Sequence, residues 1–238
     1  MGILRTGNEY YYEEQSVFRS FKNAGLRPDV IFAIGFARPA WFRSMTLVFP
    51  EAQIHVFEPL VGPKQIDGEK TDRALPDPPS LHRHSVALGA VDGRNKSILD
   101  WAGGSATTVL QRAFSDVRRA LKAPIYRLET IVSQSNLPRP DVMKLDAPGI
   151  ELEILKGANS LLDSVQVIQL KSWLTRHYGG PLLHEVIEFL GKKKFSPIDF
   201  GGFVFSPIHE LNALDIYFAR IDLLAEYGAR LSRGHLGH

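Results

Sequence analysis

Four short apolar segments constrain the fold of this chain more than any other feature. They are residues 30–35, 54–59, 142–146 and 165–170, and each ends in or is followed by Gly, Glu, Asp or Lys. Runs this continuous are typical of strands buried on both faces of a parallel sheet. Ligands of such sheets bind beyond the carboxyl ends of the strands. The residues that end these runs are therefore the first candidates for a functional site.

The segments between these runs predict helices that alternate with strands. Helical patterns lie at residues 9–24, 41–49, 109–121, 129–135, 151–157 and 182–191. Further strands are predicted at 84–88, 97–101, 126–128, 195–200 and 215–220, with a long loop between the last two. Strands and helices alternating at this spacing predict βαβ units with right-handed crossovers. A length of 238 residues favours one large α/β domain.

Composition narrows the function classes. A net charge of +2, without a basic face that carries interleaved aromatic residues, argues against a nucleic-acid partner. The absence of cysteine excludes disulfides, a thiolate nucleophile and a Cys-ligated metal. No apolar stretch is long enough to span a membrane, and the N-terminal residues lack the apolar core of a signal peptide. We expect a cytoplasmic protein with no membrane partner.

Five blocks of the chain, taken in order, resemble the FkbM-type family of S-adenosylmethionine-dependent methyltransferases. They are residues 49–59, 87–93, 140–158, 178–186 and 215–220. The resemblance implies a Rossmann-like class I methyltransferase fold. Such a fold has a seven-stranded, mostly parallel sheet with one antiparallel strand near its edge. We expect an N-terminal helical extension at residues 1–27, the α/β domain at 28–222 and a C-terminal tail at 223–238.

The resemblance also implies S-adenosylmethionine as the cofactor, bound by Gly35, Glu58, Ala87 and Leu88. An acid at the end of the second strand, such as Glu58, can accept hydrogen bonds from both ribose hydroxyls of an adenosine-containing ligand. The alternative for Glu58 is an exposed acid that caps the turn before Pro59.

Lys144 and Asp146 end the third apolar run and are the candidate catalytic residues. The carboxylate of Asp146 could take a proton from a substrate hydroxyl. It could equally cap the helix that includes Glu151, and both roles can coexist. Glu151 matches an acid of the family, or is a first-turn residue favoured by the helix dipole. The resemblance implies a small-molecule acceptor, such as a hydroxyl of a sugar or secondary metabolite.

Three residues depart from the family pattern. Ala33 stands where the family has an acid and cannot accept a hydrogen bond from the ammonium group of the cofactor. Pro39 replaces a glycine, lacks an N–H donor and has a fixed φ. Lys171 stands where an acid is typical, and its charge opposes a sulfonium cation. The alternative function is therefore an inactive pseudo-methyltransferase, a binding or scaffold module that takes an anionic ligand on a basic rim of Arg38, Lys144 and Lys171.

The histidines His82 and His84 flank Arg83. Alternate residues of a strand point to the same face, so the two side chains could share a metal ion. No third ligand stands at a telling spacing, and the sequence favours two surface histidines and no metal site.

Overall fold

The structure of the chain is a computed structural model that describes residues 7–35, 39–59, 80–93, 124–147, 149–174, 181–205 and 211–226. The helices are α1 Gly7–Ala24, α2 Pro39–Val48, α6 Leu128–Gln134, α7 Glu151–Ala158, the 3-10 helix η1 Asn159–Asp163 and α8 Leu183–Lys192. The strands are β1 Val30–Gly35, β2 Gln53–Phe57, β3 Leu81–His84, β4 Ala87–Leu88, β5 Ile125–Tyr126, β6 Val142–Asp146, β7 Val167–Trp173, β8 Phe195–Phe205 and β9 Leu211–Arg220.

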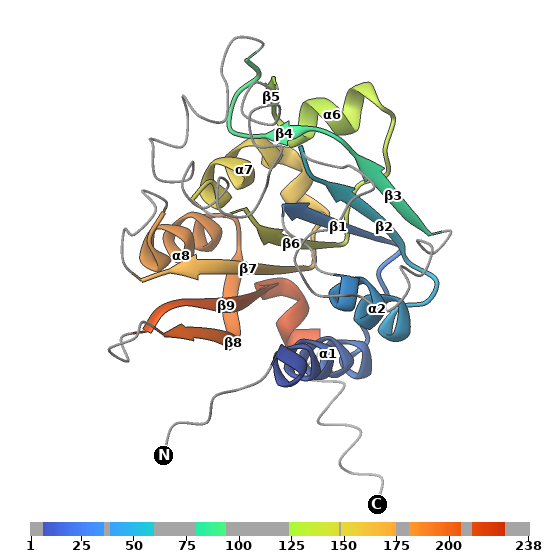
Figure 1. The fold of residues 1–238 in the computed structure, drawn as a ribbon, viewed down its shortest axis with the longest axis vertical. Helices are drawn as coiled ribbons and strands as arrows, with labels where there is room; N and C mark the ends of the chain where they lie inside the picture. The colour runs from blue at the N-terminus through green and yellow to red at the C-terminus, as the bar shows by residue number, and fades with distance from the viewer. Residues whose placement is uncertain are drawn as a thin grey trace, which may run out of the picture.

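Within these ranges the main sheet has seven strands in the order β3-β2-β1-β6-β7-β9-β8 (Figure 1). The pairs from β3 to β7 are parallel. Strand β9 lies between β7 and β8 and is antiparallel to both. The expected fold class is confirmed, with β9 as the single antiparallel strand of this sheet.

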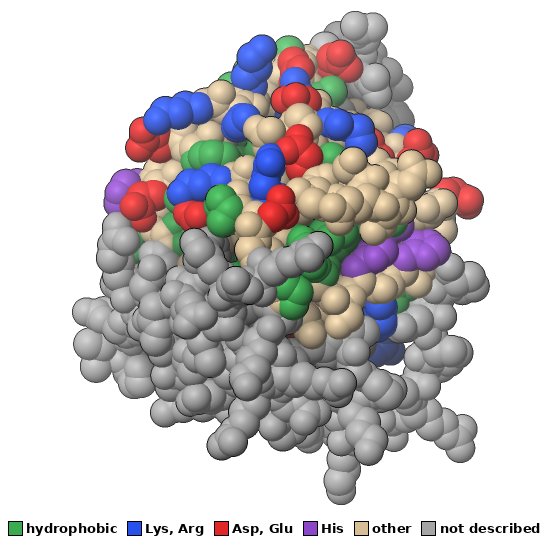
Figure 2. All heavy atoms as spheres, turned by 90° about the horizontal axis from the view of Figure 1, so that it is seen from above, with side chains coloured by type: hydrophobic (Ala, Val, Ile, Leu, Met, Phe, Trp, Pro, Cys, Tyr) green, Lys and Arg blue, Asp and Glu red, His purple; other side chains and the backbone are tan. Residues whose placement is uncertain are grey.

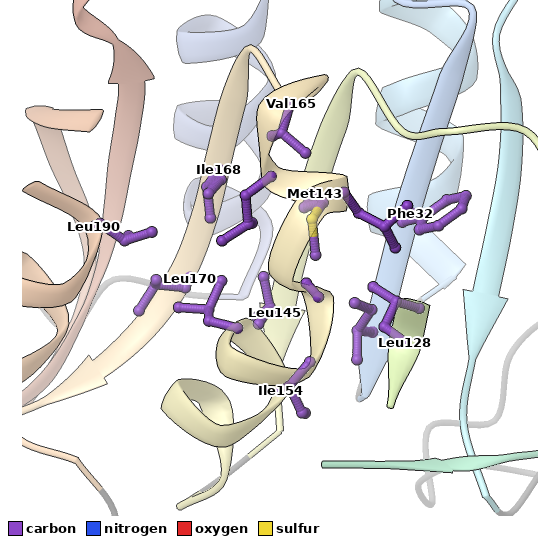
Figure 3. Close-up of a cluster of buried hydrophobic side chains, with 14 of the residues drawn as sticks. Phe32, Leu128, Met143, Leu145, Ile154, Val165, Ile168, Leu170 and Leu190 are labelled. Carbon is purple, nitrogen blue, oxygen red and sulfur yellow. The ribbon is translucent and has the colours of Figure 1, made fainter. Parts of the chain in front are cut away.

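Helices cover both faces of the sheet (Figure 1). Alternate residues of a strand point to opposite faces, so each central strand supplies two cores. Ile31 and Val142 pack with α1 and α2 on one face. Phe32, Met143 and Leu145 pack with α6, α7 and α8 on the other, where Figure 3 shows them in one layer of buried side chains that runs from Leu190 to Leu128. Burial on both faces explains why these strands read as continuous apolar runs.

Helix α1 packs directly on the sheet. Its residues Phe18, Phe21 and Ala24 are buried in the same cluster as Ile31 and Trp41. Phe18 makes an edge-on contact with the Tyr217 ring of β9, with centroids 5.9 Å apart. No helix in the described ranges is long and apolar enough to cross a bilayer. The domain boundary expected after residue 27 stays a prediction, although the contacts of α1 belong to the core of the α/β layer.

Two predicted elements differ from the structure. The strand expected at residues 84–88 is broken, because the Val86 N–H bonds back to the His84 carbonyl (3.0 Å) and β4 pairs with β5 in a second sheet. The loop expected after residue 200 is shorter, because β8 continues past Gly201 through a shift in register, and bulges let a strand bend without ending. The elements predicted at 97–101 and 109–121 lie outside the described residues.

Candidate active site

Three of the predicted site residues meet at the carboxyl edge of the parallel strands. Gly35 is paired with Asp146, and Ile34 is paired with Phe57, so that Glu58 follows directly beside Gly35. Neighbouring strands lie about 4.8 Å apart, which places the three backbones in a row about 10 Å long. The register therefore brings the expected cofactor and catalytic positions to one place.

Gly35 is required by this arrangement. Its φ is +81°, in the left-handed region, and a Cβ at this position would collide with the Asp146 carbonyl oxygen. The chain thus turns sharply at the end of β1 while it touches the end of β6. Residues 36–38, including Arg38, lie outside the described residues. Pro39 is the first residue of α2, a position where proline is favoured because the first N–H groups of a helix have no partner within the helix.

Glu58 is held beside the end of β3. Its N–H donates to the His84 carbonyl (3.1 Å), and the Ser85 hydroxyl donates to the Pro59 carbonyl (3.4 Å). Ala87 and Leu88 follow in β4, and both side chains are buried. Their role in cofactor binding stays a prediction.

Lys144 lies two residues before Asp146 in β6, on the face of the sheet that α1 and α2 cover. Its side chain is buried, with Nζ 3.5 Å from Glu14 Oε1 of α1 and 4.9 Å from the centre of the Trp41 ring. The Gln169 amide also donates to Glu14 and accepts from Trp41 Nε1 (3.3 Å). Ala33 of β1 is the strand partner of Lys144. The structure therefore places Lys144 in a buried ion pair and not beside Asp146 at the edge.

Sequence reasoning missed Glu14, which precedes Lys144 by 130 positions. One signal was present. A lysine in the middle of an otherwise apolar strand needs a partner of opposite charge, because an isolated buried charge is costly. The sequence does not say which acid supplies it.

Lys171 carries no uncompensated charge. Continuing the register of β6 and β7 by one residue places it beside Asp146, and its Nζ forms an ion pair with Asp215 Oδ1 of β9 (2.9 Å). Burial raises the pKa of Asp215. The expected repulsion of a sulfonium cation by Lys171 stays a prediction, and the pairing with Asp215 would weaken it. The partner was hidden because β9 inserts 44 positions later in the chain.

Glu151 is a further charged residue near Asp146 and Lys171. It is the first residue of α7 and only 1% exposed. Its Oε2 accepts the Gly149 N–H (3.0 Å), while Oε1 has no hydrogen-bond partner among the described residues. Burial first, and then the charge of Asp146, raise the pKa of Glu151 to about 8, against the opposing effect of Lys171. The alternative role of Asp146 as a helix cap is wrong, because the N-cap position is Ile150 and has no side-chain cap.

The histidines form a cluster that includes a residue that the sequence did not single out. His55 of β2 is buried, with Nδ1 3.0 Å from His84 Nε2 and its ring 4.8 Å from that of His82. Figure 2 shows histidine side chains at two opposite margins of the described surface. His84 is half-buried, which corrects the expectation of two surface histidines. No group of three or more His, Asp or Glu side chains among the described residues is arranged so that it could hold a metal ion.

Acidification is expected to destabilise the fold through His55. Burial, with smaller contributions from His84 and His82, lowers its pKa from 6.5 to about 4. The stabilisation from the neutral ring is complete above about pH 6.5 and is lost as the pH falls towards 4. It amounts to at most about 3 kcal/mol. Urea unfolding at pH 7 and pH 4.5 measures it.

The matched variant for this measurement is His55→Phe, which keeps a ring beside Phe32 but cannot titrate. We expect a smaller loss of stability between the two pH values than in the unaltered chain. Equal losses would show that carboxyl groups elsewhere cause the whole effect.

Comparison with known proteins gives one matching family and several similar solved structures. Residues 40–197 match the family described as methyltransferase FkbM domain. Among solved structures, the chain is similar to magnesium protoporphyrin IX methyltransferase from Synechocystis PCC 6803 with bound SAM (10% identity, 92% and 86% of the two chains covered, TM-score 0.41). It is also similar to the N-methyltransferase NodS from Bradyrhizobium japonicum WM9 (8%, 90% and 98%, TM-score 0.42). No curated protein matches the chain.

Proposed function

The chain belongs to the methyltransferase FkbM domain family, and on this premise we propose that it transfers a methyl group from S-adenosylmethionine to a small-molecule hydroxyl. The acceptor would be a sugar or a secondary metabolite. The row of Gly35, Glu58 and Asp146 at the carboxyl edge carries this proposal. Open α/β sheets bind their ligands at this edge, so one row can hold both reactants.

The described residues fit this cofactor. The Glu58 carboxylate follows β2, where it can accept the two ribose hydroxyls. Glu151 Oε1 and Asp215 Oδ2 are buried acceptors without a hydrogen-bond partner among the described residues, which suits a ligand that carries positive charge. Bound S-adenosylmethionine supplies a methyl group on a sulfonium, which an oxygen nucleophile can attack.

The residues of the chain hold the two reactants in position and supply a base. The Asp146 carboxylate ends β6 and is the group proposed to take the proton of the acceptor hydroxyl. Strands on both sides of β6 hold its backbone, so Asp146 has a defined place relative to Gly35. Holding the two reactants together lowers the entropic part of the barrier.

Calorimetric titration with S-adenosylmethionine and S-adenosylhomocysteine tests the proposal. We expect both to bind, and Glu58→Ala to weaken both by at least about tenfold, because hydrogen bonds to a charged group contribute roughly 1.5–3 kcal/mol. The control is Glu51→Ala, which removes an exposed acid from the turn before the same strand and should leave both affinities unchanged. Failure of the unaltered chain to bind either ligand would refute the proposal.

The second candidate is an inactive binding module with the same fold. Ala33 favours it, since this residue is fully buried in β1 and offers no side-chain acceptor. A preference for anions lacks support among the described residues, because Lys144 and Lys171 each have a carboxylate partner. Binding of both ligands without methyl transfer to any of a panel of sugars and hydroxylated metabolites would favour this candidate. A cytoplasmic location and a small-molecule partner stay predictions.

A further inference from the structure

We propose that the protonation state of Glu151 changes with the charge on the sulfur of the cofactor. It loses its proton when the sulfonium cation binds, and it regains one when the methyl group has left and the sulfur is neutral. This inference rests on the proposed function and adds a residue that distinguishes the methyl donor from its product.

The first support is the position of Glu151 above the end of β6. The chain leaves β6 at Asp146 and turns at Gly149, whose φ is +89°, before α7 begins. The Gly149 N–H then holds Glu151 Oε2 (3.0 Å). The carboxyl group is thereby folded back towards the edge of the sheet, within the electrostatic reach of Asp146 and Lys171.

The second support is the oxygen that lacks a partner. Glu151 Oε1 is buried and has no hydrogen-bond partner among the described residues, and the same holds for Asp215 Oδ2. A buried ionised carboxylate with an unsatisfied oxygen is costly. A proton on the carboxyl group relieves this cost, and so does a nearby cation.

The third support is the balance of charge around Glu151. Asp146 faces it from β6 and Lys171 from β7, and Lys171 is held by Asp215 of β9. Helices α6 and α8 pack against α7 through apolar residues, among them Leu128 and Val186. Among the described residues, three carboxyl groups thus share one ammonium group. Without a ligand a proton bound to Glu151 offsets part of the excess negative charge, and a sulfonium cation can take its place.

The pH range over which Glu151 ionises suits this change of protonation state. Burial raises the pKa of Glu151 to about 8, so that the free protein holds the proton at neutral pH. A cation nearby favours the ionised form and lowers that pKa. A neutral thioether has no such effect. The exchange therefore separates S-adenosylmethionine from S-adenosylhomocysteine by charge alone.

The protons balance over the whole reaction. Cofactor binding releases the Glu151 proton to water. Methyl transfer forms an oxygen–carbon bond, breaks a carbon–sulfur bond whose electron pair stays on sulfur, and frees the hydroxyl proton. Asp146 takes this proton and passes it to Glu151, whose ionised form has lost the cation that favoured it. The net result is one proton released for each methyl group transferred.

The test is calorimetric titration of the full chain between pH 6 and pH 9, in two buffers of different ionisation enthalpy. We expect S-adenosylmethionine to release up to one proton and to bind up to about tenfold more weakly for each pH unit that the pH falls below about 8. S-adenosylhomocysteine should release none and show a flat profile. Glu151→Gln carries an uncharged group of the same shape and should abolish both the proton release and the pH dependence.

A matched control separates this effect from the loss of any acidic side chain on the same helix. Glu153→Gln alters a half-exposed acid on the same helix that is paired with Lys156, and it should behave as the unaltered chain. Should Glu151→Gln fail to fold, infrared difference spectra of the unaltered chain give the answer. A protonated-carboxyl band should disappear with S-adenosylmethionine and persist with S-adenosylhomocysteine.

The outcomes are distinguishable. Equal pH profiles for the two ligands, or a slope that survives in Glu151→Gln, would overturn this inference and leave the proposed function standing. Retention of the infrared band with both ligands would do the same. Failure to bind either ligand would refute the proposed function and the inference together.

Discussion

Replacing Glu14 by alanine is expected to destabilise the fold by about 3–5 kcal/mol, because it leaves the Lys144 ammonium buried without its counter-charge. Lys144 is 6% exposed and is paired with Glu14 alone among the described acids. The Gln169 amide would lose its hydrogen bond to Glu14 in the same change and keep the one to the Tyr217 hydroxyl. Unfolding in urea at pH 7 measures the difference in free energy.

Two variants check the cause. Glu153→Ala breaks an exposed pair with Lys156 and should cost less than about 1 kcal/mol. The double variant Glu14→Leu with Lys144→Met removes both buried charges and should recover most of the lost stability, since apolar replacements of buried pairs are often neutral. A double variant as unstable as Glu14→Ala would mean that shape, and not charge, sets the cost.

Gly35→Ala is expected to cost about 2–5 kcal/mol and to weaken cofactor binding. A non-glycine residue in the left-handed region costs roughly 1–2 kcal/mol, and forcing a methyl group into a packed site costs roughly 1–3 kcal/mol more. The added Cβ would collide with the Asp146 carbonyl oxygen and reach the Ala147 side chain. The ends of β1 and β6 would have to separate, and they carry the proposed site.

Gly191→Ala is the matched control. Gly191 lies inside α8, and a Cβ there meets nothing within 4 Å. Alanine should stabilise this helix by about 0.5–1 kcal/mol. The same substitution is thus expected to have opposite signs at the two glycines, as urea unfolding can show. A loss at Gly35 no larger than 1 kcal/mol would mean that the two strand ends are not tightly joined.

The central strands as buried parallel strands, and the edge of the sheet where the proposed site lies, could be predicted from the sequence. The runs that contain Ile31 and Met143 are apolar at every position because both faces are buried, and few other structures produce such a pattern. Once the strands are parallel, the residues that follow them must meet at one edge. Gly35, Glu58 and Asp146 were therefore within reach of sequence reasoning.

The partners of the charged residues were decided by tertiary structure alone. Lys144 obtains its carboxylate from α1 and Lys171 obtains one from β9, at 130 and 44 positions along the chain. The role proposed for Glu151 likewise depends on a turn that folds it back over β6. A sequence shows that a buried charge needs a partner, because desolvation is costly whatever the fold. Which acid arrives depends on helix packing and strand insertion, and these follow from the burial of the whole chain.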